Sequence, residues 1–178
     1  MCASFSQILA QTNKRPNIIF IMSDDHAYQA ISAYDQRLIS TPNIDRIAKK
    51  GILFTNASVT NSICAPSRAT ILTGKHSHLN GKVDNHFKFD TTNITFPQIL
   101  QANGYQTAMF GKLHFGNSPK GFDQFKILPG QGVYYNPTFI TKNEGNIEVE
   151  GYVTDLITDI TLDWLENEMK EEEPFFFY

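Results

Sequence analysis

Two adjacent carboxylates follow the first apolar run of the chain. Residues 17–22 read Asn-Ile-Ile-Phe-Ile-Met, and Asp24 and Asp25 come directly after the next serine. At the end of a strand the backbone can turn both side chains toward one ion, and hard divalent cations favour several oxygen ligands. The alternative is a strand-to-loop turn in which aspartate serves as a cap. Asp24 and Asp25 are therefore candidate metal ligands.

A cysteine stands in a polar turn that leads directly into a predicted helix. Residues 64–75 read Cys-Ala-Pro-Ser-Arg-Ala-Thr-Ile-Leu-Thr-Gly-Lys. The free N–H groups and positive potential of a helix N-terminus bind anions and lower the pKa of a thiol. Arg68 can reach back one turn toward Cys64, and Pro66 suits a first helical turn because its missing N–H costs nothing there. The pattern favours an anion-binding nucleophile turn, with a lightly buried cysteine in a capping loop as the alternative.

A cation and an imidazole alternate where another predicted strand ends. Residues 111–116 read Gly-Lys-Leu-His-Phe-Gly. Lys112 and His114 are two residues apart, so they share a face of an extended segment. Such a pair suits an anionic substrate and proton transfer. The alternative is two exposed residues on a β-extension.

Composition narrows the class of protein. The chain has 178 residues, of which 41% are hydrophobic, and a net charge of −3. No basic run exceeds two residues, which disfavours nucleic acid as a partner, and no apolar stretch approaches the ~20 residues of a transmembrane segment. Residues 1–15 resemble the tail of a secretory signal without its basic and long apolar parts. Export and an ordinary disordered N-terminus both remain open.

The order of predicted elements indicates an α/β fold. The patterns predict strands at 17–22, 52–57 and 105–110 and from residue 175, helices at 41–51, 66–73, 96–102 and 152–169, and an irregular excursion at 117–150. The continuous apolar run at 17–22 is typical of a fully buried parallel strand. Strands alternating with helices favour a mostly parallel sheet with helices on both faces. Ligands bind at the carboxyl ends of such strands. The pair Asp24 and Asp25 and the pair Lys112 and His114 each follow a predicted strand, so both pairs are expected at those ends.

Together these stretches resemble the signatures of type I sulfatases, which belong to the alkaline phosphatase superfamily. The resemblance rests on residues 64–68 with 72–74, residues 104–105 with 111–114, the pair at 24–25, and residues 41–45. It runs from about Arg15 to the last residue. It implies an alkaline phosphatase-like fold in which residues 16–178 are the front part of the catalytic domain, continuing beyond the chain end.

The resemblance also implies a mechanism. In sulfatases a maturation enzyme oxidises the motif cysteine to formylglycine, and a hydroxyl of its hydrate attacks sulfur. By this resemblance the modified Cys64 is the nucleophile and Arg68 anchors its hydroxyl. Lys112 would bind sulfate oxygens, and His114 would assist proton removal when sulfate is released.

The cofactor implied by the resemblance is Ca²⁺, held by Asp24, Asp25 and the modified Cys64. The family's second metal pair and a later histidine and lysine are expected beyond Tyr178, so the 178-residue chain alone is expected to be inactive.

The substrate implied is a sulfated carbohydrate. The loops at 75–78, 84–86 and 121–137 look most like those of bacterial exo-acting sulfatases of glycosaminoglycans and mucins, with the N-acetylglucosamine-6-sulfatase group nearest. Asp84, Asn85 and His86 are candidate substrate-binding residues, with a solvated loop as the alternative. Two rival functions remain: a phosphate or phosphonate monoester hydrolase of the same superfamily, and a non-catalytic carbohydrate-binding relative.

Overall fold

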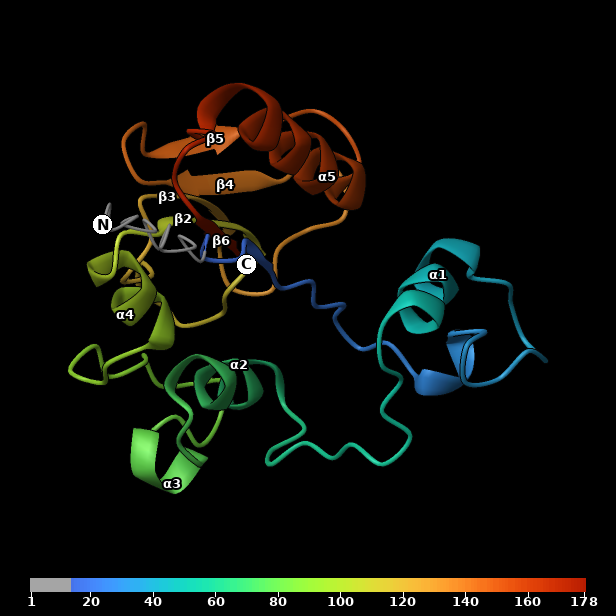
Figure 1. The fold of residues 1–178 in the computed structure, drawn as a ribbon. Coiled ribbons are helices and arrows are strands. Elements are labelled where there is room, and N and C mark those ends of the chain that lie inside the picture. The colour runs from blue at the N-terminus through green and yellow to red at the C-terminus, as the bar shows by residue number, and fades with distance from the viewer. Residues whose placement is uncertain (1–13) are drawn as a thin grey trace, which may run out of the picture.

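A six-stranded sheet forms the centre of the computed structural model, which describes residues 14–178. The predicted signal remnant at 1–15 therefore lies, except for its last two residues, outside the described residues. The sheet has the order β1-β6-β2-β3-β4-β5 (Figure 1). Its strands are β1 (Ile18–Ile19), β2 (Gln106–Lys112), β3 (Gln124–Leu128), β4 (Thr138–Thr141), β5 (Asn146–Glu148) and β6 (Phe175–Phe177). Pairing is parallel from β1 to β3 and antiparallel from β3 to β5, which confirms the predicted mostly parallel sheet.

Helices cover both faces of this sheet, as predicted. The helices of residues 14–178 are α1 (Pro42–Lys50), α2 (Cys64–Thr73), α3 (Ser77–Asn80), α4 (Phe96–Ala102) and α5 (Val153–Asp163), with a 3₁₀ turn η1 (Tyr28–Ala30) and a π-helical turn η2 (Trp164–Glu168). Successive strand side chains point to opposite faces. Met109 and Phe176 therefore pack toward α2 and α4, whereas Phe110 and Phe177 pack toward α5 and η2.

Helix α1 lies away from the sheet, beside η1 (Figure 1). It begins and ends where its sequence signals predict, with Pro42 in the first turn and Gly51 after the last. Its start is fixed by a carboxylate: Asp45 accepts hydrogen bonds from Ser32 Oγ at 2.8 Å and from Thr41 Oγ1 at 2.9 Å. This network stabilises the segment that follows β1.

Two of the predicted strands differ from the structure. The run at 17–22 is not fully buried: only Ile18 and Ile19 form β1, and Ile21 is 78% exposed. β1 is an edge strand that packs through alternate residues on one face, so the apolar run overstated its burial. Residues 52–57 form no strand, and all six are exposed. A strand needs a neighbouring edge to hydrogen-bond with, which β propensity alone does not supply.

Other boundaries also shift. The helix predicted at 66–73 begins two residues earlier, at Cys64. The excursion predicted at 117–150 was wrong in part, because it contains β3, β4 and β5. The helix predicted at 152–169 is confirmed as α5, but its last turn is π-helical. There Trp164 is buried, 3% exposed, between the sheet strands and the helix.

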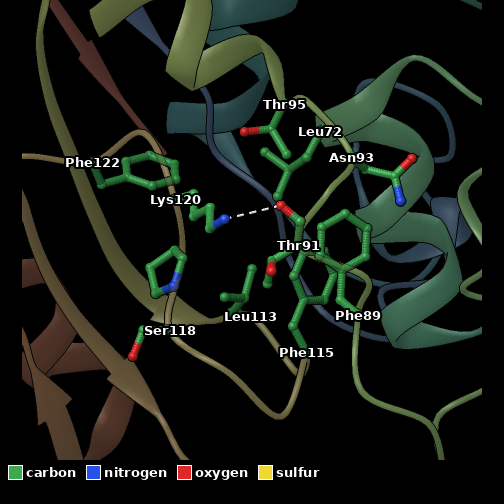
Figure 2. Close-up of a pocket in the computed structure, with 11 residues that line it drawn as sticks. Leu72, Phe89, Thr91, Asn93, Thr95, Leu113, Phe115, Ser118, Lys120 and Phe122 are labelled. Carbon is green, nitrogen blue, oxygen red and sulfur yellow. Dashed lines mark hydrogen bonds between the residues drawn. The ribbon is translucent and has the colours of Figure 1, made fainter.

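A layer of apolar side chains packs α2 against the loop that follows β2. The rings of Phe89 and Phe115 stack with their centroids 4.4 Å apart. Figure 2 shows these two rings, with Leu72 of α2 and Phe122, around one small hollow. Lys120 at its edge donates a hydrogen bond to the carbonyl of Thr91 at 3.0 Å. This layer fixes α2 and, with it, the position of Cys64 at the helix start.

One glycine in this region leaves no room for a side chain. Gly121 has φ +84°, and a Cβ there would lie 2.3 Å from the backbone nitrogen of Gln98. Gly121→Ala is therefore expected to lower the free energy of unfolding by about 2–5 kcal/mol, from left-handed strain plus overpacking. Gly145 has φ +76° with nothing within 4 Å, so Gly145→Ala tests the strain alone, at about 1–2 kcal/mol. Urea unfolding of both variants measures the difference, and equal losses would contradict the predicted clash.

Candidate active site

Cys64 is the first residue of α2, and its surroundings fix that end of the helix. The preceding Ile63 is extended, with φ −122° and ψ 147°, and has no side-chain acceptor with which to cap the helix. Ser67 N–H donates to the carbonyl of Ile63 at 3.0 Å, and Ala65 N–H donates to Asn85 Oδ1 at 3.0 Å. Ala65 itself is fully buried. Cys64 is thus held at a helix N-terminus anchored to the core.

The ammonium group of Lys112 joins three segments of the chain. Its Nζ donates to the carboxylate of Asp24 and, at 2.6 Å, to Gln131 Oε1, and it lies 3.6 Å from Cys64 Sγ. Asp24 follows β1, Lys112 ends β2 and Gln131 follows β3. The carboxyl ends of these parallel strands lie at one edge of the sheet. The structure therefore brings together three of the residues that the sequence selected, with Gln131 in addition.

Arg68 lies within this group as a buried cation. Its side chain is 4% exposed, its NH1 donates to the carbonyl of Lys112 at 2.6 Å, and its NH2 is 3.9 Å from Asp24 Oδ1. Its buried Nε has no hydrogen-bond partner among residues 14–178. Two cations thus share one carboxylate, and the local excess of positive charge suits an anion.

The charges of the site set the protonation states of its acid and base groups. Burial alone would raise the pKa of Asp24, but the hydrogen bond from Lys112 and the charges of Lys112 and Arg68 outweigh it and lower that pKa. Burial, followed by the charges of Lys112 and Lys82, lowers the pKa of His114 below its ordinary 6.5. Near pH 7 Asp24 is therefore ionised, whereas His114 is neutral and can accept a proton.

His114 is placed by unusual backbone geometry. It has φ +63°, and its buried Nδ1 has no hydrogen-bond partner among the described residues. Non-glycine residues in this conformation are uncommon and cluster at functional sites. The position is compatible with the predicted proton-transfer role, which stays a prediction.

Residues 14–178 form only part of the predicted metal site. Asp25 is exposed and has φ +45°, next to the ionised Asp24. Their oxygen donors are the type that Ca²⁺ prefers, and Ca²⁺ takes six to eight of them. Within residues 14–178 no group of three acidic, histidine or cysteine side chains is arranged to hold a metal. The donor chemistry fits Ca²⁺ as part of a site, and metal binding stays a prediction.

The three candidate substrate-binding residues have different surroundings. Asp84 Oδ1 accepts the N–H groups of His86 at 2.8 Å and Phe87 at 3.3 Å, which forms its own turn. Asn85 faces the start of α2 through Ala65, whereas His86 is exposed. Substrate contact by this loop stays a prediction.

Two residues near the site were missed. Gln131 lay in the predicted excursion, although the alternating Phe125 and Ile127 before Pro129-Gly130 could have indicated a strand that ends just before it. Lys82 is 1% exposed, and burial is the main cause of its lowered pKa. Nothing in its sequence surroundings distinguishes it from a surface lysine.

Comparison with known proteins places these residues in context. A family model described as Sulfatase matches residues 16–178. An N-acetylglucosamine-6-O-sulfatase from Bacteroides thetaiotaomicron is 50% identical over 176 residues, which is 97% of this chain and 31% of that protein. The chain therefore spans about a third of the length of this curated relative.

Solved structures show the same fold. One, in complex with its substrate D-glucosamine-2-N,6-O-disulfate, is 51% identical, with a TM-score of 0.88 over 92% of this chain and 33% of that chain. The phosphonate monoester hydrolase of Agrobacterium radiobacter has a TM-score of 0.70 at 18% identity, over 92% of this chain and 40% of that chain. The second likeness concerns the fold alone. No helix of residues 14–178 is long and apolar enough to cross a membrane.

Proposed function

The chain belongs to the sulfatase family, and from that premise we propose that its protein hydrolyses a sulfate ester on a carbohydrate, using formylglycine made from Cys64. The observation that carries the proposal is the meeting of Cys64, Lys112, Arg68 and Asp24 at one sheet edge. A nucleophile position beside two cations suits attack on a sulfate group. The chain itself spans about a third of the length of its curated relative.

The side chains of the site have distinct roles in this proposal. Lys112, already 3.6 Å from Cys64 Sγ, binds a sulfate oxygen and stabilises the charge of the transition state. Arg68, buried and rigidly held, orients the oxygen of the modified residue 64. His114, neutral near pH 7, accepts the proton whose removal accompanies sulfate release.

Two groups complete the chemistry. Formylglycine would supply a hydrated aldehyde: one hydroxyl would attack sulfur while the S–O bond to the sugar alcohol breaks, and loss of the proton from the other would re-form the aldehyde and expel sulfate. Asp24, Asp25 and the modified residue 64 would hold Ca²⁺, which when bound acts as a Lewis acid on a sulfate oxygen. The rest of the metal and sulfate ligands would come from the remainder of a full-length protein. Export is part of the same proposal, since large sulfated glycans lie outside cells.

The favoured substrate is N-acetylglucosamine 6-O-sulfate within a glycosaminoglycan or mucin. Support comes from the 50% identity with an N-acetylglucosamine-6-O-sulfatase and from the similar structure that binds a 6-O-sulfated glucosamine. A phosphate or phosphonate monoester hydrolase is the second candidate, since the two cations at the Cys64 site would suit those anions as well.

Sulfate release tests this proposal. Full-length protein, with conversion of Cys64 verified by peptide mass, is expected to release sulfate from N-acetylglucosamine-6-sulfate faster than from the galactosamine analogue. Paired aryl sulfate and aryl phosphonate esters separate the two reactions. Release from another sulfated sugar alone would reject the substrate assignment and keep the sulfatase. Faster phosphonate than sulfate hydrolysis would reject the sulfatase assignment.

A further inference from the structure

Asn85 lies 21 residues after the start of α2 in sequence but contacts its first turn directly. Its Oδ1 accepts the N–H of Ala65, the residue after Cys64, at 3.0 Å. We propose that Asn85 is a positioning residue for the nucleophile: it caps α2 from another loop and thereby fixes residue 64 beside Lys112. This inference rests on the proposed function and assigns Asn85 a role other than the predicted contact with substrate.

The start of α2 needs an external cap. The first four N–H groups of a helix have no intrahelical partner, and a side chain at the N-cap position usually accepts one of them. Here that position is Ile63, which offers no side-chain oxygen. Of the three residues that follow Cys64, Pro66 has no N–H and Ser67 donates to the carbonyl of Ile63, so Ala65 is the donor that needs an acceptor from outside the helix, which Asn85 supplies.

The loop that carries Asn85 is held from inside. Lys82, only 1% exposed, donates from its Nζ to the carbonyl of Phe87. The segment between these two residues is further tightened by the Asp84 turn. A lysine has three donors and a long apolar stem, so burying it here ties both ends of the loop 82–87 to each other.

A buried asparagine anchors the same loop to α2 and α3. Asn80, 1% exposed, accepts the N–H of Lys82 at 2.8 Å through its Oδ1. Its Nδ2 donates to the carbonyl of Lys75 at 2.9 Å, just after α2. The C-terminal end of α2 is thus connected, through Asn80 and Lys82, to Asn85, which caps the N-terminal end of the same helix. A chain of buried polar contacts of this kind positions a side chain more rigidly than a surface loop does.

The two roles open to Asn85 use different atoms of its amide. Capping uses Oδ1 as an acceptor, whereas the Nδ2 donors would serve a sulfated or hydroxylated substrate. Asn85→Asp keeps an acceptor oxygen at the helix N-terminus, where negative charge is favourable, and removes the donors. Asn85→Ala removes both. Asn146, exposed on the edge strand β5, provides the matched control Asn146→Ala.

Amide hydrogen exchange in the full-length protein tests the cap without reference to activity. The next residue, Pro66, has no amide hydrogen, so the exchange of the Ala65 amide does not overlap with that of its neighbour on the C-terminal side. Its exchange is expected to become at least about tenfold faster in Asn85→Ala and to stay near wild type in Asn85→Asp and Asn146→Ala. Unchanged exchange in Asn85→Ala, or equal acceleration in Asn85→Asp, would overturn the proposal.

Kinetics of the matured enzyme distinguish positioning from binding. Asn85→Ala is expected to lower kcat roughly 10- to 100-fold with KM changed less than about threefold, because a misplaced nucleophile slows the reaction step. Asn85→Asp is expected to restore kcat to within about threefold. A raised KM with normal kcat in Asn85→Ala would instead make Asn85 a substrate ligand. Absence of sulfate release by the wild-type protein would reject the proposed function, while the exchange result would still decide the cap.

Discussion

Replacing Cys64 with alanine is expected to abolish turnover. Sulfate release by the full-length protein should fall at least about 1,000-fold, because a covalent nucleophile is removed and the remaining groups can only bind the substrate. Folding should be unaffected, since the Ala65–Asn85 hydrogen bond and the buried face of α2 do not use the thiol. Inorganic sulfate released from N-acetylglucosamine-6-sulfate under single- and multiple-turnover conditions is the measurement.

Two comparisons sharpen this result. Unmatured protein, with Cys64 intact and its peptide mass unchanged, should be as inactive as Cys64→Ala, since a thiol attack would leave an ester with no internal route of release. Cys2→Ala makes the same substitution outside residues 16–178, to which the family match is confined, and should retain full activity. Normal release by Cys64→Ala would contradict the assigned nucleophile.

Removing the ammonium group of Lys112 is expected to have the second largest effect. Lys112→Ala should lower kcat/KM about 100- to 1,000-fold, because one preorganised cation at the developing charge is lost. Asp24 would keep only the more distant Arg68 at 3.9 Å, so its pKa should rise. Lys112→Arg keeps the charge but should recover little, since a planar guanidinium cannot replace a compact ammonium between a carboxylate and residue 64.

Lys120 supplies the matched control for that substitution. It is exposed and donates a hydrogen bond to the carbonyl of Thr91 beside the hollow under α2 (Figure 2). Lys120→Ala is expected to leave kcat/KM within about twofold of wild type, as for an isolated surface contact. Steady-state kinetics of the three variants compare these effects. A loss in Lys120→Ala equal to that in Lys112→Ala would show a general effect of lysine removal rather than a site effect.

Much of the site could be predicted from sequence because its residues occupy ends of elements. Asp24, Cys64 and Lys112 each follow or open a recognisable strand or helix, and a parallel sheet gathers such ends at one edge. Asn85 and Gln131 could not be placed in this way. The loop of Asn85 is shaped by the burial of Lys82, which the surrounding sequence does not reveal. The path of the loop that carries Gln131 is set by the long-range pairing of β3 with β2.

Helices and strands were predictable where the sequence pattern of one short segment alone determines them. The structure confirms the bounds of α4 and the start of β6, and it confirms the strand predicted at 105–110 as β2, which begins one residue later and ends two residues later. Residues 52–57 have strong β propensity but no neighbouring edge among residues 14–178, whereas β4 and β5 have weak patterns and pair with each other. Strand formation depends on a partner that a local pattern does not contain.

The position of β6 determines when this region can fold during synthesis. β6 lies between β1 and β2, so the first strand of the sheet has no neighbour until residues 175–177 have been made. Phe176 and Tyr178 also belong to the core cluster that packs against α2. Ribosomes add about 5–20 residues per second. After Cys64 emerges, roughly 6 to 23 seconds therefore pass before residue 178 has been added and β6 can join the sheet. If Cys64 is modified as proposed, the modifying enzyme would have an extended chain as its substrate during that interval.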